Sequence, residues 1–126
     1  NILNKKNDTV ITELSGGLMT PYNDNFFSIH IPIALKLPLL FIVTPNVNSL
    51  NNYLNEINTA KTAGADIAGV IINKYPLYSE NPDIKEFPSM IEKYSDVKVL
   101  GLIRNFKGRS VEANVLFNEI LKKVLN

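Results

Sequence analysis

The chain has 126 residues, of which 45% are hydrophobic and 20% charged, a composition typical of a folded domain with its own core. Thirteen basic residues balance twelve acidic ones, so neither a nucleic-acid-binding surface nor an acidic disordered tail is indicated. The absence of cysteine excludes disulfides, thiol catalysis and thiolate metal sites, and it is compatible with a cytoplasmic location.

Four short apolar runs predict β-strands, at residues 9–12, 39–43, 67–72 and 97–103. The second and third runs are nearly continuous and rich in β-branched residues, as strands covered on both faces are. No run approaches the roughly 20 apolar residues that a membrane span needs, so no membrane partner is expected. Residues 1–8 resemble the end of an earlier helix and a loop rather than a signal peptide, and they predict that the natural protein begins further upstream.

Helices are predicted between and after these strands. Residues 50–60 and 113–124 carry apolar side chains every three or four positions. Two further helices contain a proline and are expected to be short, beginning near Ile29 and Phe87. The order βαβαβαβα with brief loops predicts an α/β fold: one domain over residues 1–126, with a doubly wound parallel sheet of about four strands and flanking helices.

In such sheets, ligands bind beyond the carboxyl ends of the strands. The segments that follow the four strands are residues 13–24, 44–49, 73–81 and 104–108, and each is polar or contains glycine. Candidate functional residues are therefore sought there.

Glu13 follows the first predicted strand and precedes the glycine pair Gly16-Gly17. A carboxylate at a strand end suits Mg²⁺, and small residues let backbone N–H groups approach an anion. The alternative is a solvated acid followed by a flexible turn.

Asn73 ends the third predicted strand, and Asn48-Ser49 precede the most regular helix. A side-chain amide can pair with the edge of a purine, and a helix N-terminus attracts carboxylate or phosphate. The alternatives are ordinary turn chemistry for Asn73 and simple helix capping for the other pair. The single histidine, His30, is expected to be structural. The sequence contains no complete phosphate-binding loop of the Gly-x-x-x-x-Gly-Lys-[Ser/Thr] type.

In combination, these segments resemble dethiobiotin synthetase. Glu13 to Pro21 is similar to the family segment Glu-Gly-x-Gly-Gly-x-x-x-Pro, and Ser49-Leu50-Asn51-Asn52 to its Ile-Asn-His helix start. Ala68 to Asn73 is similar to an Ala-Gly-(apolar)₃-Asn strand, and Val99 to Ile103 to the final strand. The resemblance extends in order from about Asp8 to Phe106 and implies a P-loop NTPase-like fold, of which this chain is the C-terminal half.

The resemblance implies an enzyme with a small-molecule substrate. In that family, 7,8-diaminopelargonate takes up CO₂ as a carbamate, ATP phosphorylates the carbamate, and the second amine closes the cyclic urea of dethiobiotin. Mg²⁺ accompanies ATP, and a homodimer shares the substrate site across its interface. The family's phosphate loop, its lysines and a second acidic metal ligand are expected upstream of this chain, so the 126 residues alone are expected to be inactive.

By position, the resemblance implies a role for each matching residue. Glu13 corresponds to a Mg²⁺ ligand. Nucleotide contacts correspond to Ser15, Gly16, Asn73, Ile103, Arg104 and Asn105, and contacts with the substrate carboxylate to Asn48, Ser49, Leu50 and Asn51.

The chain departs from the family pattern at Leu14, Asn46, Asn48 and Arg104, where the family has three glycines and a proline. Two alternatives therefore stay open. One is a non-catalytic regulatory or dimerisation module of the same fold. The other is a related ATP-dependent enzyme of the cobyrinate a,c-diamide synthase type.

Overall fold

The structure is a computed structural model that describes residues 10–14, 16–46, 48–76, 78–105, 115 and 118–123. The elements in chain order are β1 (Pro21–Asn23), β2 (Phe26–Phe27), α1 (His30–Leu35), β3 (Leu39–Val43), α2 (Leu50–Thr62), β4 (Ile67–Tyr75), α3 (Pro82–Ser95) and β5 (Val99–Arg104). Residues 118–123 are also helical.

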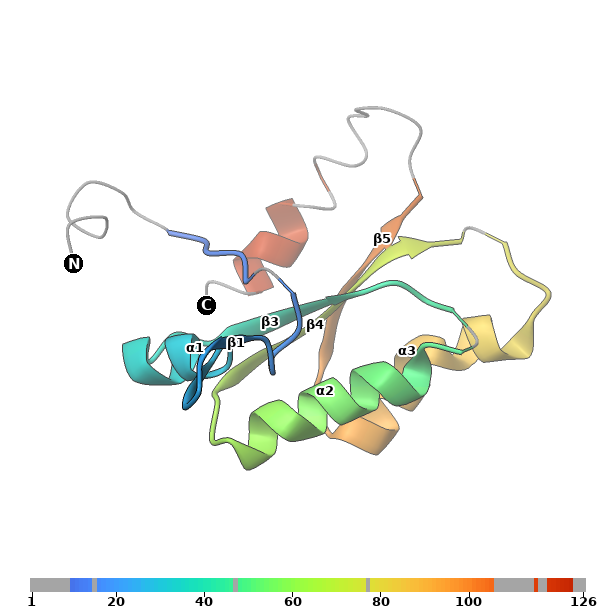
Figure 1. The fold of residues 1–126 in the computed structure, drawn as a ribbon. Helices are drawn as coiled ribbons and strands as arrows, with labels where there is room; N and C mark the ends of the chain where they lie inside the picture. Colours follow the sequence, from blue (N-terminus) through green and yellow to red (C-terminus); the bar gives the residue numbers. More distant parts are fainter. Residues whose placement is uncertain are drawn as a thin grey trace.

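The centre of the fold is a parallel sheet in the strand order β3-β4-β5. Helices α2 and α3 lie against one face of the sheet, and the helical residues 118–123 lie over the other (Figure 1). The contact with the second face is close, because a Cβ atom on Gly101 of β5 would collide with the side chain of Ile120. The predicted α/β fold with a parallel sheet and helices on both faces is confirmed.

The first predicted strand is wrong within the described residues. Residues 10–12 join no β-ladder, and the side chains of Val10 and Ile11 are 40% and 78% exposed. An apolar run becomes a strand only when a neighbouring strand accepts its backbone hydrogen bonds. Thr9 lies outside the described residues. The short antiparallel hairpin β1-β2, at residues 21–27, was not predicted from the sequence.

The third helix is longer than the sequence predicts. It begins at Pro82 rather than near Phe87, because Asn81 caps its N-terminus and Pro82 suits the first helical position. Pro88 lies inside the helix, where it has no N–H to donate to the carbonyl four residues earlier. Burial of Phe87 and Ile91 on either side of the proline offsets this loss. The shorter α1 begins where expected, with Ile29 at its N-cap.

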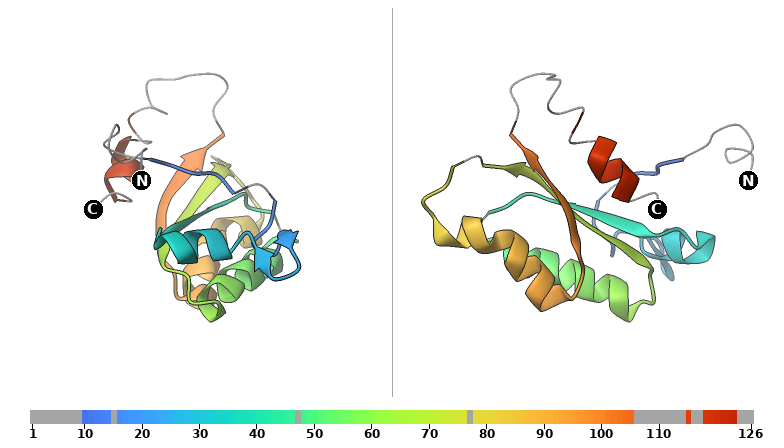
Figure 2. Two further views of the ribbon diagram at one scale, coloured as in Figure 1. Left: turned by 60° about the vertical axis from the view of Figure 1, so that its left-hand side comes forward. Right: turned by 180° about the vertical axis from the view of Figure 1, so that it is seen from behind.

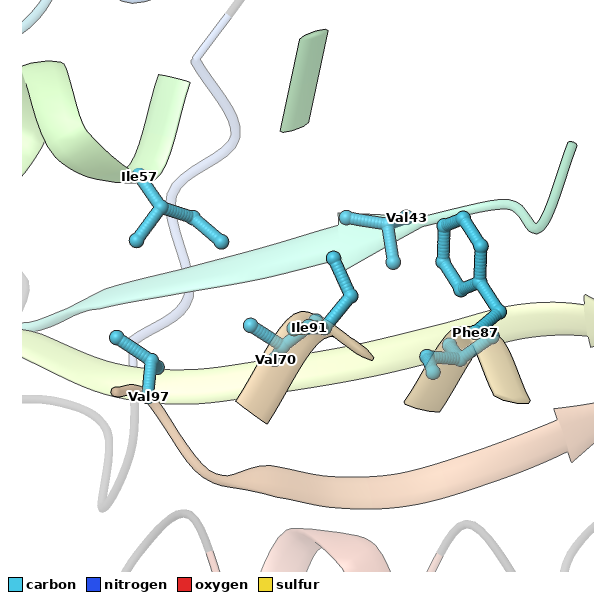
Figure 3. Close-up of a cluster of buried hydrophobic side chains, with 7 residues drawn as sticks. Val43, Ile57, Val70, Phe87, Ile91 and Val97 are labelled. Carbon is cyan, nitrogen blue, oxygen red and sulfur yellow. The ribbon is translucent and has the colours of Figure 1, made fainter. Parts of the chain in front are cut away.

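Two apolar clusters hold the elements together. The main one lies between the sheet and helices α2 and α3 (Figure 3); it consists of Val43, Ile57, Val70, Ile72, Phe87, Ile91 and Val97. The second joins Leu18, Ile29 and Ala60, and so packs the chain around the hairpin against α2. No described helix is long and apolar enough to cross a membrane.

Candidate functional site

The carboxyl edge of the sheet gathers most of the candidate residues. Strand pairing places Ile72 opposite Leu102 and Tyr75 opposite Arg104, so Asn73 lies beside the end of β5. Figure 1 shows the ends of β4 and β5 and the loop from β3 to α2 at this same edge. The expected nucleotide residues at positions 73 and 103–105 are therefore brought together, and the expected substrate residues at positions 48–51 begin α2 nearby.

The N-terminus of α2 has no side-chain cap. Ser49 is the N-cap residue, but its Oγ donates to the carbonyl oxygens of Asn46, at 2.9 Å, and Thr44, at 3.3 Å. The first turn also contains no acidic residue. The interpretation of Ser49 as a simple capping side chain is therefore wrong. Because no side chain caps this turn, its N–H groups and the positive end of the helix dipole can bind an anion.

The loop before α2 is held from both ends. The Thr44 N–H donates to the Tyr53 hydroxyl oxygen at 3.2 Å, and the Asn48 N–H donates to the Asn46 side-chain oxygen at 3.0 Å. The Asn46 side chain thus accepts a backbone hydrogen bond from Asn48, the two positions at which the chain departs from the glycines of the family pattern. The Tyr53 ring packs edge-to-face on Phe87, with centroids 6.2 Å apart, so the loop is connected directly to the main core.

Asn73 lies half-buried at an irregular point of β4. Its side-chain oxygen accepts the Lys74 N–H at 2.9 Å, and Lys74 has a positive φ of 55°. That backbone conformation is uncommon outside glycine and often marks functional sites. The Asn73 amide nitrogen has no hydrogen bond to the described residues, so it can donate to a ligand at the sheet edge.

Segment 10–14, which contains Glu13, is not brought to this edge. Glu13 and Gly16 are exposed, and Ser15 lies outside the described residues. In Figures 1 and 2, segment 10–14 lies near the helical residues 118–123 and apart from the ends of β4 and β5. Among the described residues, no group of three or more histidine, aspartate or glutamate side chains could hold a metal ion. The unpaired segment 10–12 explains the displacement, because only a strand in the sheet would carry Glu13 to its edge.

An independent comparison identifies the fold family. Residues 1–109, which are most of the chain, match the family model of an AAA domain. The chain belongs to this AAA domain family. The P-loop NTPase-like fold predicted from the sequence is thereby confirmed.

Relatives of this AAA domain include bacterial proteins described as ATP-dependent dethiobiotin synthetase BioD. The protein of Bacillus cereus strain B4264 is 34% identical over 116 residues, which is 92% of this chain and 48% of the relative. The protein of Bacillus subtilis subsp. natto is 31% identical over 102 residues, which is 79% of this chain and 43% of the relative. The protein of Bacillus thuringiensis strain Al Hakam is 33% identical over 112 residues, which is 89% of this chain and 46% of the relative. The predicted resemblance to dethiobiotin synthetase is confirmed, and the chain spans about half the length of these curated relatives.

The AAA domain also contains an acidic residue that the sequence analysis missed. Glu56 lies half-buried on α2, and its Oε2 accepts the Leu18 N–H at 3.4 Å. The spacing of Glu56 could have revealed it in the sequence. Glu56 follows Tyr53 by three residues and precedes Ala60 by four, so it lies at the border of the apolar face of the helix. A charged residue at such a border can reach a neighbouring segment.

Proposed function

We propose that the protein is an ATP- and Mg²⁺-dependent dethiobiotin synthetase that converts 7,8-diaminopelargonate to dethiobiotin. The similarity to relatives of that name supports the proposal. The structural observation that supports it best is the placement of Asn73 beside the end of β5, at the carboxyl edge of the sheet. A base-reading amide and an anion-binding helix end are what a nucleotide and a substrate carboxylate require.

In this proposal, Asn73 recognises the adenine, and Ile103, Arg104 and Asn105 flank the base. The Asn73 amide nitrogen donates to a ring nitrogen of the base, and its oxygen, which has a second lone pair, accepts from the exocyclic amine. Arg104 is exposed and takes the place of the family's proline. Its guanidinium is planar and charged and can stack on the base, whereas proline has neither a planar nor a charged side chain.

The substrate carboxylate binds at the first turn of α2, formed by Asn48, Ser49, Leu50 and Asn51. The positive end of the helix dipole and the backbone donors bind the carboxylate without any charged side chain. We further propose that this turn serves the site of a second subunit, so that a homodimer forms each complete site.

Mg²⁺ fits this chain through one residue, Glu13, whose exposed carboxylate is a hard oxygen ligand. Proteins often bind Mg²⁺ through one or two carboxylates, with waters and phosphate oxygens completing the shell. A bound Mg²⁺ would neutralise charge on the transferred phosphate. Because segment 10–14 by itself does not reach the carboxyl edge, we propose that the upstream half brings Glu13, Ser15 and Gly16 to the nucleotide.

The residues of this chain bind and orient rather than transfer protons. Phosphoryl transfer depends on positioning and charge neutralisation, so no acid–base triad is required. We propose that residues 1–126 are the C-terminal portion of a larger nucleotide-binding domain, whose upstream half contains the phosphate loop. The chain alone is therefore inactive, and turnover by the purified 126 residues would contradict this.

The test is isothermal titration of Mg·ATP into the protein extended upstream to the length of its relatives. Asn73→Ala should weaken binding about tenfold, the loss expected for roughly 1.4 kcal/mol of hydrogen bonding. Asn58→Ala, an exposed change on α2, is the matched control and should bind as the wild type does. The absence of any binding heat in the wild type would favour the regulatory or dimerisation module instead.

A further inference from the structure

The glycine turn at residues 16–18 is in contact with the middle of α2. The Leu18 N–H donates to Oε2 of Glu56 at 3.4 Å, and a Cβ atom on Gly17 would lie 3.2 Å from Oε1 of the same carboxylate. Both carboxylate oxygens of Glu56 therefore face this turn. Glycine at position 17 leaves the space that the carboxylate occupies.

The backbone of the turn is also restricted from its other side. Gly16 has a φ of +80°, and a Cβ atom there would lie 2.5 Å from the Thr20 hydroxyl oxygen. The Thr20 N–H donates to the Gly17 carbonyl oxygen at 3.1 Å, and the Ile29 N–H donates to the Leu18 carbonyl oxygen at 2.9 Å. Leu18 is thus held through its carbonyl by the chain before α1, and through its N–H by Glu56.

Apolar packing alone does not specify which group of the helix the turn contacts. Leu18 packs with Ile29 and Ala60, and such contacts are non-directional. The hydrogen bond to Glu56 has a direction and a defined partner. Because Glu56 is six residues after Leu50, it lies about 9 Å along the helix axis from the uncapped first turn.

We propose that Glu56 is a positioning residue, which holds the turn at residues 16–18 at a defined place on α2. Gly16 belongs to this turn and Glu13 precedes it by three residues, so Glu56 limits how far both can lie from the substrate-binding end of the same helix. The second part rests on the proposed function, in which Glu13 binds Mg²⁺. The first part does not depend on it.

A carboxylate suits this role because it accepts hydrogen bonds without donating any. Bonds to a charged acceptor are stronger than bonds between neutral groups. Glutamine keeps an acceptor oxygen at the same distance from the backbone but has no charge. Alanine removes both the acceptor and the charge, so the two substitutions separate hydrogen bonding from charge.

The first measurement is hydrogen exchange at the Leu18 amide in the 126-residue chain, followed by NMR. Glu56→Ala should raise the exchange rate about fivefold, as the loss of one hydrogen bond predicts. Glu56→Gln should restore the rate to within about twofold of the wild type. Glu86→Ala, which removes an exposed carboxylate on α3, is the control and should leave the rate unchanged. Far-UV circular dichroism confirms that each variant is folded.

The second measurement is the Mg²⁺ dependence of turnover in the upstream-extended protein. Glu56→Ala should raise the half-saturating Mg²⁺ concentration about threefold or more with little change in kcat, and Glu56→Gln should rescue it. A merely structural role would lower the amount of active enzyme without moving this concentration.

The outcomes separate the two proposals. An unchanged Leu18 exchange rate in Glu56→Ala overturns the positioning role. A raised exchange rate with unchanged Mg²⁺ dependence overturns the connection to Glu13. If the wild type shows no Mg·ATP-dependent turnover, the proposed function fails, while the exchange rate still decides whether Glu56 holds the turn.

Discussion

Replacement of Phe87 tests whether the main core supports the candidate site. The Phe87 side chain is completely buried and packs edge-to-face on Tyr53, with ring centroids 6.2 Å apart. Phe87→Ala removes the ring from a cluster that joins α2, α3 and the sheet. Truncation of a buried phenylalanine to alanine costs about 3–5 kcal/mol. Because the alanine also loses the aromatic pair with Tyr53, we expect a loss near the upper half of that range.

The loss is large compared with the whole stability of a domain, which is typically about 5–15 kcal/mol. Urea unfolding followed by circular dichroism measures it directly. With a slope of about 2 kcal/mol per molar urea, a loss of about 4 kcal/mol lowers the midpoint by roughly 2 M. Phe87→Leu keeps most of the volume and should lose about 1–2 kcal/mol.

Tyr94→Ala is the matched control on the same helix, because the Tyr94 side chain is 61% exposed. It should change the free energy of unfolding by less than about 1 kcal/mol, including its contact with Lys93. A loss of unfolding free energy below about 1.5 kcal/mol for Phe87→Ala would refute the reasoning. Removal of a fully buried ring costs more than this unless the core differs from the one described.

Two further substitutions test the packing of other elements by the same urea assay. Gly101→Ala places a Cβ atom in collision with Ile120, so we expect a loss of about 1–3 kcal/mol in the wild type and a smaller loss when Gly101→Ala is made in an Ile120→Ala background. If Gly101→Ala were neutral, the helical residues 118–123 would not lie on β5. Asn81→Ala removes the side-chain oxygen that accepts the Asp83 N–H at 2.9 Å and should cost about 1 kcal/mol. Asn81→Asp keeps the cap and should stay close to the wild type, and equal losses in the two variants would exclude capping as the cause.

The elements predicted most accurately are those whose signal is local. Strand β3 was predicted with the bounds Leu39–Val43, and α2 from its regular apolar spacing. The apolar run of β3 and the regular apolar face of α2 are local features of the sequence, which need no knowledge of distant contacts. Since parallel strands all point the same way, their order along the chain also places Asn73 and the end of β5 at one edge.

Interactions between distant residues decided the rest. Residues 10–12 have the composition of a strand but lack a neighbouring strand, so Glu13 does not reach the edge in the described structure. Helix α3 continues through an internal proline because burial of its apolar side chains in the core stabilises it more than the proline destabilises it. Local helix propensity does not include this burial.

The sequence by itself thus determined the class of fold, the parallel sheet and the kind of residue at its carboxyl edge. Only the tertiary structure decided that Ser49 leaves the first turn of α2 uncapped and that Glu56 contacts a turn 38 positions away in the chain. The physical reason is that periodicity reports which face of an element is buried. The partner of a hydrogen bond, in contrast, is set by whichever distant backbone group the packing brings within about 3 Å.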